Sequence, residues 1–79
     1  MLEELKTDRK VVGLKQLRKA LGAGSTKKIF VALDADPALT EPIIAQCAAN
    51  GIAVVWVPTM KQLGEACNIS VAAAVAAII

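Results

Sequence analysis

This 79-residue sequence contains no histidine, no tyrosine, one phenylalanine and one tryptophan. Histidine is the commonest general base and a frequent metal ligand, so its absence argues against most hydrolytic and zinc-dependent sites. The shortage of aromatic residues argues against a surface that binds single-stranded nucleic acid by stacking bases on several rings. We therefore expect the one tryptophan, Trp56, to pack in the core or at a sheet edge.

Cysteine is also scarce, with only Cys47 and Cys67 in the chain. Two cysteines are fewer than a disulfide-stapled secreted domain carries, and without histidine they do not complete a tetrahedral zinc site. A nucleophilic cysteine needs a group that stabilises its thiolate, and none is evident. We expect both thiols to be reduced and Cys47 to be buried, and we expect neither a metal nor a cofactor.

Long hydrophobic runs are missing as well. The longest apolar stretch, residues 71–79, is far short of the roughly 20 residues that a membrane-spanning helix needs. The first ten residues, MLEELKTDRK, lack the apolar core of a secretory signal. We therefore expect a cytoplasmic protein that does not enter a membrane, with residues 1–79 forming a single domain.

The charge is present but unevenly distributed. Residues 1–28 carry eight of the nine basic residues against three acidic ones, a net charge of +5, whereas residues 29–79 have a net charge of −3. The overall value of +2 hides this contrast. A concentrated positive surface on a small domain is typical of proteins that bind polyanions.

The hydrophobic pattern alternates short apolar strands with helices, which indicates a sheet covered by helices. Asp36 before Pro37 is a strong helix start, and Asn68 suits the left-handed end of the third helix. The alanines of the tail favour helix, but its Val and Ile residues favour strand, and we expect a fourth strand there.

The expected strands cover residues 10–13, 28–33, 52–57 and part of 69–79, and the expected helices cover 14–21, 37–49 and 58–66. A short helical lead-in is expected over residues 1–9, docked by Leu2 and Leu5, and the buried face of the second helix is expected to consist of Leu39, Ile43, Ile44, Cys47 and Ala48.

The first full helix separates its cations from its leucines. Lys15 and Lys19 share one face with Arg18 beside them, and like charges at this spacing repel unless an anion lies between them. They fall in the first turns of the helix, where the dipole also favours an anion. Gly13 permits close approach of another backbone, and Gln16 adds a donor and an acceptor that suit a base edge. A solvated lysine-rich face accounts for the charges about equally well.

Asp34 and Asp36 are the best candidates for acid–base or metal chemistry. Asp36 is already explained as a helix cap, and Asp34, at a strand end, is placed to cap backbone groups or orient a lysine. No third carboxylate lies nearby, and the sequence has no glycine-rich phosphate loop. An enzyme is therefore the least favoured interpretation.

Three segments, in this order and spacing, resemble the kink-turn-binding ribosomal proteins of the large-subunit 7Ae and 30e family, especially its short bacterial branch. The segments are Gly13-x-Lys15-Gln16-x-x-Lys19, Ala32-x-Asp34-x-Asp36-Pro37, and the run from Leu63 to Ile78 that contains Gly64, Asn68 and Ile69-Ser70-Val71-Ala72. The resemblance covers nearly the whole chain. It implies a three-layer α/β/α sandwich with a four-stranded mixed sheet.

The resemblance also implies a binding mode. Members of this family recognise the kink-turn, a sharply bent RNA duplex with tandem sheared G·A pairs. By resemblance, Gly13 allows close approach, Lys15 and Gln16 meet guanine edges, and Lys19 reaches a guanine or a phosphate. The loop formed by Ile69, Ser70, Val71 and Ala72 would cover the nucleotide flipped out of the bulge. From charge alone, Lys28 and Lys61 are expected to make flanking phosphate contacts.

The sequence departs from archaeal relatives at this surface. Lys15 and Gln16 stand where those proteins usually carry Asn-Glu, although the bacterial branch shares the Lys-Gln pair. This change shifts the balance from base reading towards phosphate attraction, and Ala23, where archaeal relatives commonly have an arginine, removes one contact. Binding should therefore be more sensitive to salt.

Two hypotheses follow. In the first, the protein is a monomeric, non-catalytic binder of kink-turns in ribosomal or leader RNA. In the second, it is a protein-interaction or assembly module on the same fold, with the apolar segment 69–72 and the alanine-rich tail as its contact surface.

Overall fold

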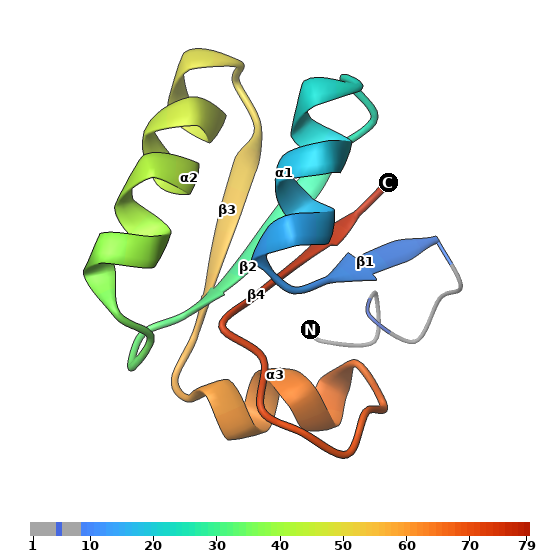
Figure 1. Ribbon diagram of the computed structural model, residues 1–79, viewed down its shortest axis with the longest axis vertical. Coiled ribbons are helices and arrows are strands. Elements are labelled where there is room, and N and C mark those ends of the chain that lie inside the picture. Colours follow the sequence, from blue (N-terminus) through green and yellow to red (C-terminus); the bar gives the residue numbers. More distant parts are fainter. Residues whose placement is uncertain (1–4, 6–8) are drawn as a thin grey trace.

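The computed structural model describes residue 5 and residues 9–79 and shows three helices and four strands (Figure 1). In chain order they are β1 (Lys10–Val12), α1 (Leu14–Gly22), β2 (Lys28–Ala32), α2 (Pro37–Ala49), β3 (Ala53–Val57), α3 (Met60–Ala66) and β4 (Val75–Ile78). Most of the expected lead-in helix, including Leu2, lies outside the described residues. Leu5 is fully buried, as its expected docking on the body requires.

The strands form one mixed sheet in the order β1-β4-β2-β3. β2 and β3 are parallel, while β4 runs antiparallel to both β1 and β2. The tail is therefore a strand, as expected, and it lies in the interior of the sheet, where Ala76 and Ala77 are fully buried. The tertiary environment overrides the helical propensity of these alanines, because this position demands small side chains between two layers.

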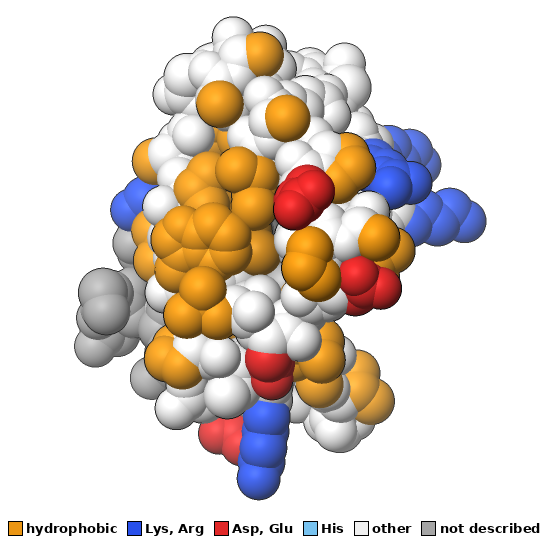
Figure 2. Space-filling model, turned by 90° about the vertical axis from the view of Figure 1, so that its left-hand side faces the viewer, with side chains coloured by type: hydrophobic (Ala, Val, Ile, Leu, Met, Phe, Trp, Pro, Cys, Tyr) orange, Lys and Arg blue, Asp and Glu red, His pale blue; other side chains and the backbone are white. Residues whose placement is uncertain are grey.

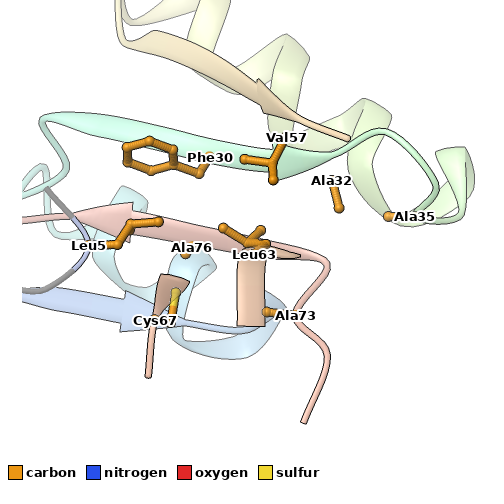
Figure 3. Close-up of a cluster of buried hydrophobic side chains, with 9 residues drawn as sticks. All are labelled: Leu5, Phe30, Ala32, Ala35, Val57, Leu63, Cys67, Ala73 and Ala76. Carbon is orange, nitrogen blue, oxygen red and sulfur yellow. The ribbon is translucent and has the colours of Figure 1, made fainter. Parts of the chain in front are cut away.

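Helices cover both faces of the sheet. α1 and α2 lie on one face, where Leu17 and Ile43 pack with Ile29 and Val31 of β2. α3 lies on the other face. There its Leu63 and Cys67 meet Phe30, Val57 and Leu5, together with small residues (Figure 3). The alternation of β2 side chains between the two clusters confirms the expected three-layer α/β/α sandwich with a four-stranded mixed sheet.

The buried face of α2 is narrower than the sequence suggested. Thr40, Ile43 and Cys47 are buried, whereas Leu39 is 42% exposed and Ala48 is also exposed. The prediction was therefore wrong for these last two residues. α2 contacts the sheet along a single stripe at positions i, i+3 and i+7, and its flanks remain in solvent.

The edge strand β3 carries Trp56, whose side chain is 48% exposed. Of the two expected positions, the core and the sheet edge, Trp56 therefore occupies the edge.

The ends of several elements converge at one end of the sheet. Gly13, which precedes α1, donates its N–H to the carbonyl of Val75 (3.0 Å), and Ala32 donates to Ala74 (2.9 Å). Ala73 in turn donates to the carbonyl of Met60 at the start of α3 (3.0 Å). These backbone bonds bring together the start of α1, the end of β2, the start of α3 and the segment that leads into β4.

Candidate nucleic-acid interface

The start of α1 is a helix terminus without a side-chain cap. Gly13 occupies the cap position with φ 97° and ψ 156°, a conformation that a residue with a side chain adopts only under strain. A Cβ placed on Gly13 would meet nothing within 4 Å, so the glycine is required here by backbone conformation and leaves open space in front of the helix. No acidic residue lies in the first turn. The positive end of the helix dipole is therefore not neutralised by its own side chains.

The side chains of α1 divide as the sequence predicted. Lys15, Gln16, Arg18 and Lys19 are exposed, while Leu17, with the other apolar positions, faces the sheet. The exposed cations follow the uncapped helix start within two turns, so the positive end of the dipole and the lysine charges reinforce each other.

A shallow hollow of about 230 Å³ lies beside this face. Gln16 and Lys19 form part of its border, and Val11, Ala20 and Ile79 contribute apolar floor. Two of the predicted RNA-contacting residues, Gln16 and Lys19, therefore border a hollow with an apolar floor.

The second candidate surface is the segment that follows α3, which we call the 69–72 loop. Asn68 has φ 60°, as the sequence predicted for the end of this helix. Within the loop, Ser70, Val71 and Ala72 are exposed, and Val71 is 67% exposed. Ile69 differs, because its side chain is half-buried and packs against the core cluster beneath α3. The structure therefore divides the predicted set into one packing residue and three surface residues.

Gly64, in the middle of α3, is a residue whose role the sequence reasoning missed. A Cβ at this position would collide with the carbonyl oxygen of Val71 and lie 3.1 Å from the Cα of Ala72. The backbone of the 69–72 loop therefore crosses directly over Gly64. The only available sequence signal was a glycine inside a helical pattern, which often marks a close packing contact.

The two flanking lysines fall in different places. Lys61 is exposed and follows Met60, whose carbonyl accepts the hydrogen bond from the N–H of Ala73. Lys28 begins β2 and pairs with Ile78, at the end of the sheet away from Gly13 and Val75. Lys61 thus lies in the first turn of α3, whereas Lys28 lies at the opposite end of the sheet.

The two aspartates serve as helix caps. Asp36 accepts a hydrogen bond from the N–H of Ala38 (2.9 Å), as expected. Asp34 accepts one from the N–H of Met60 (2.8 Å), and Thr59 accepts one from Gln62 (3.0 Å), so two side chains cap the short helix α3. Asp34 thus links the end of β2 to α3, one of the two roles the sequence allowed.

The remaining reactive side chains are protected. Cys47 and Cys67 are buried and unpaired, as expected for Cys47. Burial raises the pKa of both thiols, and the charge of Lys10 partly opposes this rise in the pKa of Cys67. Within the described part of the chain, no three potential metal-ligating side chains come together, and no helix has the length and apolarity to cross a membrane.

The uncapped basic start of α1 and the exposed 69–72 loop lie at the same end of the sheet. The fold and these two surfaces define a small α/β protein with exposed cations and an exposed loop at one end of its sheet. The chain belongs to the ribosomal protein L7Ae/L30e/S12e/Gadd45 family, whose model matches residues 2–79. The family resemblance seen in the sequence is confirmed.

Individual relatives agree with this assignment. The chain is similar to an RNA-binding protein of Bacillus pumilus, with 47% identity over 68 residues, 86% of this chain and 83% of the relative. It is 40% identical over 75 residues to an RNA-binding protein of Geobacillus, covering 95% of this chain and 92% of that protein. Among solved structures, the Giardia lamblia 15.5kD RNA binding protein matches 98% of this chain with a TM-score of 0.86 and 27% identity. The match spans 65% of the length of the Giardia protein.

Proposed function

We propose that this protein is a non-catalytic RNA-binding protein that recognises kink-turns, and that residues 1–79 act as one monomeric binding domain in the cytoplasm. The target would be a ribosomal or leader RNA. The carrying observation is that the start of α1 and the segment leading into β4 are joined by the bond from Gly13 N–H to the Val75 carbonyl (3.0 Å). This bond supports the proposal that two chemically different surfaces contact the same RNA element.

The start of α1 suits the widened groove at the tandem G·A pairs. Gly13 leaves open space in front of α1, and the first turn of α1 contains no acidic residue that would repel a phosphate. In the proposal, Lys15 and Gln16 meet guanine edges, and Lys19 meets a guanine or a neighbouring phosphate. The charge of Lys15 also attracts the backbone, which favours binding that weakens steeply with salt.

The 69–72 loop suits a nucleotide that has left the stack. Val71 is 67% exposed, and the loop otherwise presents only Ser70 and Ala72 to solvent. An apolar, uncharged surface can pack against the face of an unstacked base without demanding a particular sequence. In the proposal, the exposed Lys61 makes a flanking phosphate contact.

A non-catalytic role is favoured by how the candidate catalytic groups are used. Asp34 and Asp36 each hold a backbone N–H at a helix start, and both thiols are buried. None of these groups is presented together with a second acid–base group at the candidate surface.

A protein-contact function is a second candidate, and one observation favours it. Figure 2 faces the side of α2 and the edge strand β3, where apolar side chains gather while Lys and Arg side chains stand at the margins. Trp56 of β3 is 48% exposed, and residues 42–60 contain no charged residue at all. Concentration-dependent self-association without any preference for kink-turns would favour this candidate.

The proposed function is tested by comparing two RNAs in a gel shift at several salt concentrations. One duplex contains a kink-turn, and the other is identical except that its G·A pairs are changed to Watson–Crick pairs. We expect the kink-turn duplex to bind at least ten times more tightly. Equal affinity for the two RNAs would rule out kink-turn recognition.

A further inference from the structure

We infer that Gly64 sets the position of the 69–72 loop, and that the loop is already held in its binding position before any RNA arrives. The inference rests on the proposed function, because it takes RNA as the ligand of the loop. It makes Gly64 a positioning residue, since Gly64 acts through the loop and makes no RNA contact itself.

The first support is the closeness of the loop to α3. Gly64 is buried, and an added Cβ would collide with the carbonyl oxygen of Val71. The same Cβ would lie 3.1 Å from the Cα of Ala72 and 3.1 Å from the carbonyl carbon of Val71. All three atoms belong to backbone, which cannot swing aside as the end of a flexible side chain can. At Gly13, Gly22, Gly24 and Gly51 a Cβ would meet nothing within 4 Å.

The second support is that both ends of the loop are tied to the same helix. The N–H of Ile69 donates to the carbonyl of Gly64 (3.1 Å), and the N–H of Ala73 donates to the carbonyl of Met60 (3.0 Å). The left-handed Asn68 turns the chain back so that these bonds can form. Met60 and Gly64 are one helical turn apart, so the loop lies along one turn of α3.

The third support is the side-chain pattern of the loop itself. Ile69 packs against the core beneath α3, while Val71 directs its carbonyl at Gly64 and keeps 67% of its surface exposed. A loop that would order only on contact with RNA has no need of such anchoring. Because the backbone is already fixed, binding avoids the entropy cost of ordering it.

This arrangement predicts a distinct signature in RNA binding. Gly64→Ala pushes the loop off α3 and shifts Val71 relative to the start of α1, so the contact with the flipped nucleotide is lost. No charge is removed, so the dependence of affinity on salt concentration stays as in the natural protein. A loss of lysine charge has the opposite signature, because it lowers the slope of that dependence.

The experiment compares Gly64→Ala with Gly22→Ala. The control makes the same chemical change at another helical glycine, which is not one of the glycines with positive φ and has no neighbour within 4 Å of an added Cβ. Affinities for the kink-turn duplex and for its Watson–Crick counterpart are measured by fluorescence anisotropy between 50 and about 400 mM KCl, with the circular dichroism spectrum as a check on folding. We expect Gly64→Ala to weaken kink-turn binding about tenfold with an unchanged salt slope, and to change binding of the counterpart duplex by less than about twofold. Gly22→Ala should stay within about twofold for both RNAs.

Three results for the Gly64→Ala variant would overturn the inference. They are an affinity for the kink-turn duplex equal to that of the natural protein, an equal loss of affinity for both RNAs, and a salt slope different from that of the natural protein. Should Gly64→Ala fail to fold, amide hydrogen exchange in the natural protein without RNA decides the matter. The N–H groups of Ile69 and Ala73 should exchange as slowly as those inside α3. Rapid exchange at both would contradict a preformed loop. Because this measurement contains no RNA, it also separates failure of the loop inference from failure of kink-turn recognition.

Discussion

The start of α1 and the 69–72 loop face the same corner of the molecule, but they are built in opposite ways. The α1 surface arises from neighbours in sequence: a glycine, a helix terminus and cations within two turns. The loop surface arises from contacts distant in sequence, with Ala73 held by Met60 and Val71 seated over Gly64. The α1 surface presents positive charge, and the 69–72 loop presents an apolar contact surface fixed by packing.

This difference assigns separate tasks to the two surfaces in the proposed complex. Charge acts over a distance, attracts any phosphate backbone and weakens with salt. The apolar 69–72 loop, held against α3, acts only on contact and can distinguish an extruded nucleotide from a stacked one. We therefore expect α1 to supply the salt-dependent part of the affinity in addition to its guanine contacts, and the loop to supply a part that does not depend on salt. The lysine and loop variants should then behave differently in salt titrations.

The largest effect is expected from Lys15→Ala combined with Lys19→Ala. Taking a slope of about −0.9 per neutralised charge, two lost charges weaken binding roughly 30-fold at 0.15 M salt. The salt slope for the kink-turn duplex should fall by about two charges' worth. Salt titration by fluorescence anisotropy measures both quantities. An unchanged slope would mean that these lysines do not face phosphate, and the contrast between the two surfaces would collapse.

A smaller effect is expected from Val71→Ser, which removes the exposed apolar side chain and leaves the loop backbone in place. Partial loss of one buried valine contact is worth about 1 kcal/mol, or roughly fivefold in affinity. The loss should be confined to the kink-turn duplex and should not depend on salt. Ser70→Ala serves as the matched control, because it alters the neighbouring exposed position by one hydroxyl. Equal weakening by the two variants would remove the special role of Val71.

The substitution Asp34→Ala tests how far binding depends on the anchoring of α3 to the sheet. The Asp34 side chain accepts a hydrogen bond from the N–H of Met60 at the start of α3. Loss of a helix cap costs about 1 kcal/mol in the free energy of unfolding. We expect this loss in urea denaturation, with kink-turn affinity reduced about twofold at most, because Gly64 and the loop hydrogen bonds remain. Asp36→Ala removes the cap of α2, away from the loop, and should lower stability by a similar amount without changing affinity. A large affinity loss in Asp34→Ala alone would instead place this carboxylate at the RNA.

These variants also mark the limit of what the sequence could predict. The order of strands and helices, the exposed cations of α1 and the cap at Asp36 depend on local patterns, and all were predicted. The contact of Gly64 with the loop was not, because it joins backbone of α3 to a turn whose path depends on tertiary packing. The bond from Met60 to Asp34 spans 26 residues, and the sequence offered capping only as one of two roles. The exposure of Leu39 was missed because α2 touches the sheet along one stripe only.

The smallest effect is expected from Arg18→Ala. Arg18 is exposed and basic like Lys15 and Lys19 on α1, but it is not among the residues proposed to contact RNA. If α1 acted only as a diffuse patch of charge, this substitution would weaken binding as much as the loss of either neighbouring lysine. Defined contacts at Lys15 and Lys19 predict a change of less than about twofold at 0.15 M salt, because an exposed cation without a partner contributes little at that screening. Comparing Arg18→Ala with Lys19→Ala by anisotropy on one kink-turn duplex decides between the two descriptions, since both variants remove one charge from adjacent positions of the same helix. Equal losses would reduce the α1 surface to its net charge.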